Sequence, residues 1–283
     1  MPRLLLAFLP LSFFVLALSV NIRATHAETD VVYKKIATSQ TIRCGYAEWP
    51  PFMTIDPNTK KVSGLLYDVW ELVGKKLGLK IEWSSPLGWG EITEAVTTGK
   101  VDAFCVGVWP DTGRTKNLLL SRPVFYTPIY LYARDGDNRF DKGTDILNDS
   151  KFAVAGQDGD FTATLLGLKF PKARQVNISP MQQQGEMLLN VASGKADVTV
   201  VDVPYAHEYM AQNPHKLKRV KAPPLGIVPL DIPLAVGEYQ LKSMIDAVLN
   251  DLINDGTIAA LIKKWHAEET YPPIPEVQIP APK

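Results

Sequence analysis

The chain has 283 residues, of which 46% are hydrophobic and 21% charged, and its 30 basic residues balance its 30 acidic residues. This balance argues against a nucleic-acid-binding protein, since such proteins concentrate basic residues on one surface. The length allows two domains of ordinary size, and the apolar and charged fractions are those of a globular protein.

The amino terminus has the features of an export signal. Arg3 precedes the apolar run 4–20, and a short polar stretch ends in Ala27, which offers a small-residue cleavage site before Glu28. A retained membrane anchor is the alternative, because the run approaches the length that spans a bilayer. We favour a signal peptide over residues 1–27, whose removal takes away two arginines and no acid and leaves 28 basic and 30 acidic residues.

Alternating strands and helices are predicted for the part that follows. Strands are predicted at 41–46, 80–83 and 101–109. The segments that read as helices are 65–77, with apolar residues at three- and four-residue spacing, and 91–98. This order of elements is typical of a parallel sheet covered by helices.

An internal repeat relates two distant parts of the chain. Residues 91–108 (EITEAVTTGKVDAFCVGV) and 186–203 (EMLLNVASGKADVTVVDV) align without a gap and share the turn Gly-Lys-x-Asp. The repeat predicts two lobes, each with the same helix–turn–strand element in an α/β sheet. Ligands of open α/β sheets bind beyond the carboxyl ends of the strands. The segment 107–114 and Asp202 are therefore expected to face each other across a cleft.

The remaining segments suggest how the chain passes between the lobes and ends. The polar, aperiodic stretch 137–150 fits a crossing into the second lobe. Residues 241–253 and 258–265 each have an apolar helical face, and 271–283 contain five prolines, which predicts an extended tail.

Cys44 and Cys105 are the only cysteines of the chain. An oxidising compartment outside the cytoplasm favours a disulfide between them. Their positions in apolar, strand-like segments fit buried free thiols equally well, so both alternatives stay open. Two cysteines exclude a cysteine-rich zinc site. We expect no metal and no cofactor, because the chain has no phosphate loop, nucleophile elbow or metal-ligand spacing.

Six segments, taken in order, resemble those of the extracellular solute-binding proteins of the polar amino-acid transporter family. They are GYAEWPPF at 45–52, GLLYDVWELVGKKLGLKIEW at 64–83, GKVDAFCVGVWPDTGRTK at 99–116, LSRPVFY at 120–126, GKADVTVVDVPYA at 194–206 and NDGTIAALIKKW at 254–265. The resemblance covers about residues 40–268. It implies the two-lobed α/β fold of type II periplasmic binding proteins, in which each lobe is an open α/β sheet and two hinge strands join the lobes.

The resemblance also implies where the lobes begin and end. We expect lobe 1 to comprise 28–131 and 229–270, lobe 2 to comprise 132–228, and 271–283 to form the proline-rich tail.

Two charged residues are matched to the family's ligand-binding positions. The family's arginine at Arg114 holds the ligand's α-carboxylate, for which a guanidinium offers a bidentate fork. The alternative is a surface arginine paired with Asp111. The family's aspartate at Asp202 binds the ligand's α-amino group. Its alternative is to cap the helix that begins near Pro204.

Aromatic and glycine positions complete the expected lobe 1 wall. Trp49 and Trp89 occupy positions where similar proteins sandwich the ligand, and core packing is the alternative for both. Gly107 ends the repeated strand and is included among the ligand-binding residues.

Three positions depart from the family pattern. Trp109 and Asp111 stand where the family has hydroxyl residues that help to hold the carboxylate. In lobe 2 the family's Gly-Thr loop reads GQDGD at 156–160, where Asp158 and Asp160 fit helix caps but would repel an anion if they faced the cleft. With Asp160 included in the site, the lining favours a ligand with additional positive charge, because indoles attract cations and buried acids need cationic partners.

We therefore expect a monomeric binding protein of the periplasm, not an enzyme. It would capture an amino acid or a similar small zwitterion by hinge closure and deliver it to the membrane permease of an ABC transporter. One alternative is an enzyme similar to cyclohexadienyl dehydratase, for which Glu48 is the acid placed near the ligand. The other alternative is an accessory protein of a periplasmic redox enzyme.

Overall fold

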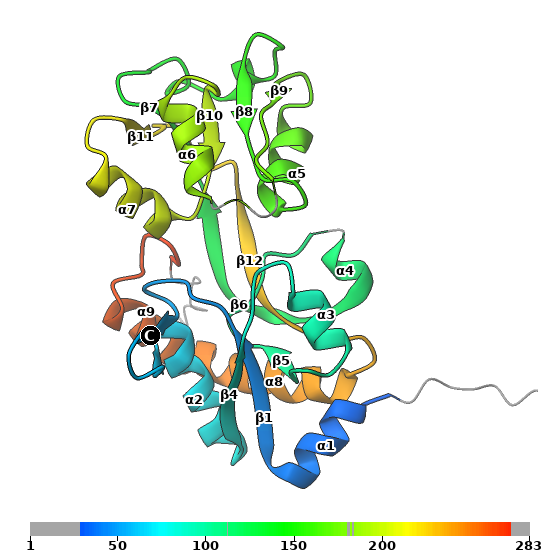
Figure 1. The fold of residues 1–283 in the computed structure, drawn as a ribbon. Coiled ribbons are helices and arrows are strands. Elements are labelled where there is room, and N and C mark those ends of the chain that lie inside the picture. Colours follow the sequence, from blue (N-terminus) through cyan, green and yellow to red (C-terminus); the bar gives the residue numbers. More distant parts are fainter. Residues whose placement is uncertain (1–28, 112, 180–181, 183, 273–283) are drawn as a thin grey trace, which may run out of the picture.

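The computed structural model describes residues 29–111, 113–179, 182 and 184–272. The predicted signal peptide, its cleavage site and most of the proline-rich tail lie outside these residues. Among the described residues, no helix is both long and apolar enough to span a bilayer. The chain forms two lobes joined by a pair of long strands (Figure 1).

Lobe 1 is built on a parallel sheet with the strand order β4–β1–β5. Its strands are β1 (Thr41–Tyr46), β4 (Lys80–Pro86) and β5 (Ala103–Phe104), with a small hairpin of β2 (Thr54–Ile55) and β3 (Val62–Ser63). Its helices are α1 (Val31–Ser39), α2 (Leu65–Leu77), α3 (Ile92–Thr97), α4 (Arg114–Asn117), α8 (Tyr239–Asn254) and α9 (Thr257–Lys264). The predicted apolar faces of α2 and α8 are buried in one core, which confirms the helical spacing.

Lobe 2 contains a mixed sheet with the order β11–β7–β10–β8–β9. Its strands are β7 (Leu131–Arg134), β8 (Ala153–Ala155), β9 (Arg174–Gln175), β10 (Val198–Val200) and β11 (Leu217–Arg219). Its helices are the short η1 (Asp145–Leu147), α5 (Phe161–Lys169), α6 (Gly185–Ala192) and α7 (Val203–Gln212). Alternate residues of β8 contribute to two different cores, one shared with α5 and the other with α6, so helices cover both faces of the sheet.

The connection between the lobes is an antiparallel pair of strands, β6 (Leu118–Ile129) and β12 (Gly226–Ala235). Both strands run from one lobe to the other in Figure 1. The polar stretch 137–150, which was expected to make the crossing, instead follows β7 inside lobe 2. Pairing explains the difference, because two crossing strands satisfy each other's backbone hydrogen bonds where few other groups are available.

The internal repeat corresponds to α3–β5 in lobe 1 and α6–β10 in lobe 2. Both of its turn glycines have a positive φ, which glycine adopts without strain. The repeated aspartate has the same role in each lobe: Asp102 accepts a hydrogen bond of 2.8 Å from the backbone N–H of Arg43 in β1, and Asp197 accepts one of 2.8 Å from Ala153 in β8. The repeated Gly-Lys-x-Asp turn therefore fixes a neighbouring strand, and its aspartate has a structural role.

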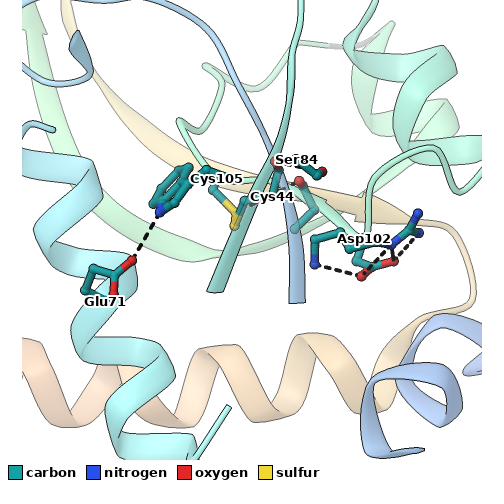
Figure 2. The surroundings of a disulfide bond; sticks show 8 residues. Cys44, Glu71, Ser84, Asp102 and Cys105 are labelled. Atoms are coloured by element: carbon teal, nitrogen blue, oxygen red, sulfur yellow. Dashed lines mark hydrogen bonds and ion pairs between the residues drawn. A yellow bond between two sulfur atoms is a disulfide. The ribbon is translucent and has the colours of Figure 1, made fainter. Parts of the chain in front are cut away.

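The predicted strand 101–109 is shorter in the structure than expected. Only residues 103–104 form β5, because the chain turns directly afterwards and Gly107 has a φ of 79°. The turn brings Cys105 beside Cys44 of β1, with their Cα atoms 5.4 Å apart, and the two sulfurs form a disulfide (Figure 2). Of the two alternatives left open by the sequence, the structure contains the disulfide.

Candidate functional site

Trp49 and Trp89 form one wall of the candidate site on lobe 1. Trp49 follows β1 and is fixed by backbone hydrogen bonds with Met53. Its ring lies edge-to-face with that of Trp89, the ring centroids being 5.9 Å apart. Trp49 is only 9% exposed and packs in the core, whereas Trp89 is 46% exposed. The two rings contact each other directly, so the predicted sandwich with a ligand between Trp49 and Trp89 does not fit this arrangement. Trp89 presents an accessible indole, Trp49 contributes to both the wall and the core, and their contact with a ligand stays a prediction.

Arg114 begins α4, and Asp111 determines how it is held. One oxygen of Asp111 accepts hydrogen bonds from the backbone N–H groups of Gly113 and Arg114, at 2.7 and 2.9 Å. The other oxygen is 3.5 Å from Nε of Arg114, while Nη1 donates to the carbonyl of Trp109 at 2.9 Å. The pairing with Asp111 that was considered as an alternative is therefore present. It orients the guanidinium and neutralises part of its charge.

Trp109 joins the lobes through its ring. The indole is 5.3 Å from the ring of Phe161 in lobe 2, and it packs against cores of both lobes. Its Nε1 is buried and has no hydrogen-bond partner within the described part of the chain. Trp109 consequently offers a hydrogen-bond donor at the inter-lobe contact, at a position where the family resemblance implied a hydroxyl.

Gly107 has a structural reason to be glycine. A Cβ atom at this position would lie 2.9 Å from a side-chain carbon of Leu230 and 3.3 Å from the carbonyl oxygen of Asp231, both in β12. Its positive φ is a second reason. Gly107 therefore lets the lobe 1 chain approach the hinge, and its contact with a ligand stays a prediction.

The acids of the lobe 2 loop are accounted for by local contacts. Asp160 is the N-cap of α5 and accepts a hydrogen bond of 2.9 Å from the backbone N–H of Thr162. Asp158 is exposed and accepts a hydrogen bond from the side-chain amide of Asn177 at 2.8 Å, so it does not cap the helix. The predicted role as a helix cap is therefore confirmed for Asp160 alone.

Asp202 lies between β10 and α7, at the inter-lobe face of lobe 2. Its carboxylate makes no capping hydrogen bond to α7, and its Oδ1 is buried without a hydrogen-bond partner among the described residues. Burial, with a smaller contribution from the negative charge of Asp160, raises the pKa of Asp202 to about 7. The indole N–H of Trp49 favours the charged form, although it makes no hydrogen bond of ordinary geometry. Asp202 of lobe 2 therefore faces Trp49 of lobe 1.

Two aromatic residues at this contact were not predicted. Phe161 is the first residue of α5, directly after Asp160, and this position next to a predicted site residue was the available signal. Tyr271 was assigned to the proline-rich tail, but its side chain is fully buried, 6.4 Å from the Trp49 ring between centroids. Nothing in the sequence pattern indicated this position, because the tail has neither helical nor strand periodicity.

Comparison with known proteins identifies the family. The model of the bacterial extracellular solute-binding proteins, family 3, matches residues 42–268. The chain belongs to this family. A protein of Bacillus subtilis, "Probable amino-acid-binding protein YxeM", is 25% identical over 90% of this chain and 91% of its own length.

Solved structures of similar proteins share the two-lobed fold. The ancestral amino-acid-binding protein AncCDT-1, a precursor of cyclohexadienyl dehydratase, is 26% identical, covers 82% of this chain and 97% of its own, and has a TM-score of 0.66. An ancestral arginine-binding protein bound to arginine is also 26% identical, covers 80% of this chain and 98% of its own, and has a TM-score of 0.64. These matches confirm the predicted family and the two-lobed α/β architecture.

Proposed function

We propose that this solute-binding protein captures an amino acid between its lobes, without converting it, and delivers it to the permease of an ABC transporter. The observation that carries the proposal is the half-buried side chain of Asp202, whose Oδ1 is buried without a partner among the described residues and which lies near Trp49 of the other lobe. A buried charge without a partner is unfavourable, and the ammonium group of a ligand relieves this cost.

Arg114 suits the other end of a zwitterion. Within the described residues its contacts use Nε and Nη1, so Nη2 is available for a carboxylate. A ligand that touches Arg114 in lobe 1 and Asp202 in lobe 2 interacts fully only when the lobes are close together. Its binding therefore shifts the population towards the closed form.

We further propose a preference for a basic amino acid or another small ammonium compound. Trp49, Trp89 and Trp109 lie on the lobe 1 side, and indole faces attract cations by about 0.5–2 kcal/mol each. Asp160 and Asp202 supply negative charge from lobe 2, while the charge of Asp111 already offsets part of the positive charge of Arg114. The similar ancestral arginine-binding protein, whose structure contains bound arginine, supports this preference for a basic amino acid.

The place of action is the periplasm, after cleavage of the export signal before Glu28. The family to which the chain belongs consists of extracellular proteins, which supports this proposal. We propose a monomer in solution, since a single chain supplies both faces of the site.

A thermal-shift screen of the mature protein with amino acids, amines and small carboxylates tests the proposal. A ligand at one hundred times its Kd adds about 2.7 kcal/mol to the free energy of unfolding. We expect the largest shifts with L-arginine or L-lysine and smaller ones with L-glutamate. The largest shift with glutamate would contradict the charge preference. No shift with any amino acid, together with conversion of prephenate or arogenate, would favour an enzyme instead.

A further inference from the structure

The C-terminal segment 266–272 bridges the two lobes. It follows α9 of lobe 1 and reaches towards α7 of lobe 2 (Figure 1). The carboxylate of Glu269 pairs with the guanidinium of Arg219 in β11 and lies 3.7 Å from Nε2 of His207 in α7. With the loop at Pro51 and the start of α7, the segment lines a pocket of about 120 Å³. The segment is thus held on both sides of the inter-lobe boundary.

This segment buries Tyr271 beside the Trp49 wall of the candidate site. The ring stacks on Phe125 of hinge strand β6, with centroids 4.5 Å apart and planes inclined by 18°. It also lies 4.7 Å from Phe52 and 6.4 Å from Trp49, between centroids. Tyr271 therefore occupies the place where the hinge, the C-terminal segment and the Trp49 wall meet.

The hydroxyl of Tyr271 is buried and has no hydrogen-bond partner in the part of the chain that the structure describes. Native proteins seldom leave buried polar groups unpaired, and each exception requires an explanation. Burial and then the charge of Asp202 raise the pKa of Tyr271 well above its usual range, so the hydroxyl stays neutral and can donate or accept. Oδ1 of Asp202 is likewise buried and without a partner among the described residues.

We propose that Tyr271 contacts the bound ligand. The hydroxyl oxygen of Tyr271 and the Asp202 carboxylate together accept hydrogen bonds from the N–H groups of the ligand's ammonium. A primary ammonium has three donors, of which one carboxylate oxygen satisfies one. The inference rests on the proposed function. The family match ends at residue 268, so Tyr271 lies beyond the part of the chain that the family model covers.

The test is calorimetric titration of Tyr271→Phe with whichever of L-arginine, L-lysine and L-glutamine binds the wild-type protein most tightly. Phenylalanine keeps the ring contacts and removes only the hydroxyl. We expect affinity to fall by about tenfold to a hundredfold, as for the loss of a hydrogen bond to a charged group. The melting temperature of the ligand-free protein should stay the same or rise, because its hydroxyl has no partner to lose.

Tyr67→Phe is the matched control, since Tyr67 stacks on Trp83 in lobe 1, with ring centroids 5.4 Å apart, away from Asp202. It should leave the affinity unchanged. Wild-type affinity in Tyr271→Phe would overturn the inference while leaving the proposed function intact. A ligand-free melting temperature that falls along with the affinity would assign Tyr271 a structural role and also overturn the inference. Failure of the wild-type protein to bind any of the three amino acids would overturn the proposed function and this inference together.

Discussion

At Asp202 the structure holds a carboxyl group in surroundings that oppose its charge. Burial and Asp160 raise its pKa to about 7, whereas an aspartate in an unfolded chain has a pKa near 3.9. Below pH 3.9 the group is protonated in both states. Between about pH 4 and 7 only the unfolded state loses its proton, so the stability of the ligand-free protein declines as the pH rises through this window.

Asp202→Asn should therefore stabilise the ligand-free protein at pH 8 but not at pH 4. The gain follows from about 1.4 kcal/mol for each unit of raised pKa and amounts to several kcal/mol. Urea unfolding at the two pH values measures it. Asp158→Asn is the control, because Asp158 is exposed in the neighbouring loop. Equal free energies of unfolding for the wild type and Asp202→Asn at pH 8 would show that the charged Asp202 carboxylate does not destabilise the ligand-free protein.

Residue roles were predictable only in part. Strand-end positions and family resemblance predicted Trp49, Arg114 and Asp202 as site residues, and the structure brings Trp49 and Asp202 near each other across the lobe boundary. Their contacts with a ligand stay predictions. The sequence left the pairing of Arg114 with Asp111 open as an alternative and did not predict that Tyr271 is buried beside Trp49. Those contacts depend on side-chain orientation and on a segment without periodicity.

Among the elements, long periodic segments were predicted most accurately. Helix α2 and strand β1 have the predicted bounds, since their apolar spacing alone specifies which face is buried. Strand β5 is much shorter than its apolar run, because the turn at residues 105–107 depends on contacts with β12. An apolar run indicates burial but does not show where a strand stops.

The disulfide that joins β1 to the turn after β5 should stabilise the folded protein. The Cys44–Cys105 disulfide closes a loop with a sequence separation of 61 residues. On the chain-entropy model, a loop of this length contributes about 4 kcal/mol by restricting the unfolded state. The double variant Cys44→Ser/Cys105→Ser should thus unfold at lower urea concentration than the wild-type protein. Wild-type protein kept in a reductant serves as the comparison. Equal midpoints in oxidised and reduced samples would indicate that the bond is absent in solution.

At the scale of the whole molecule, two lobes meet around a small set of groups contributed from both sides. Trp109 touches Phe161 across the boundary, Trp49 faces Asp202, and Glu269 pairs with Arg219. The paired strands β6 and β12 connect the lobes beside these contacts. This arrangement couples ligand binding to lobe closure, because a ligand bound by both lobes stabilises the closed form.

Whether Arg114 and Asp202 each hold one charge of the ligand is tested most directly by calorimetric titration of L-arginine into the mature wild-type protein and into the variants Arg114→Ala and Asp202→Ala. The wild-type protein should bind L-arginine saturably. Each variant should lose several kcal/mol of binding free energy, because one charge of the ligand is left without its partner. Asp158→Asn, the exposed-loop control, should bind as the wild type does. Wild-type affinity in both Arg114→Ala and Asp202→Ala would show that neither residue holds the ligand.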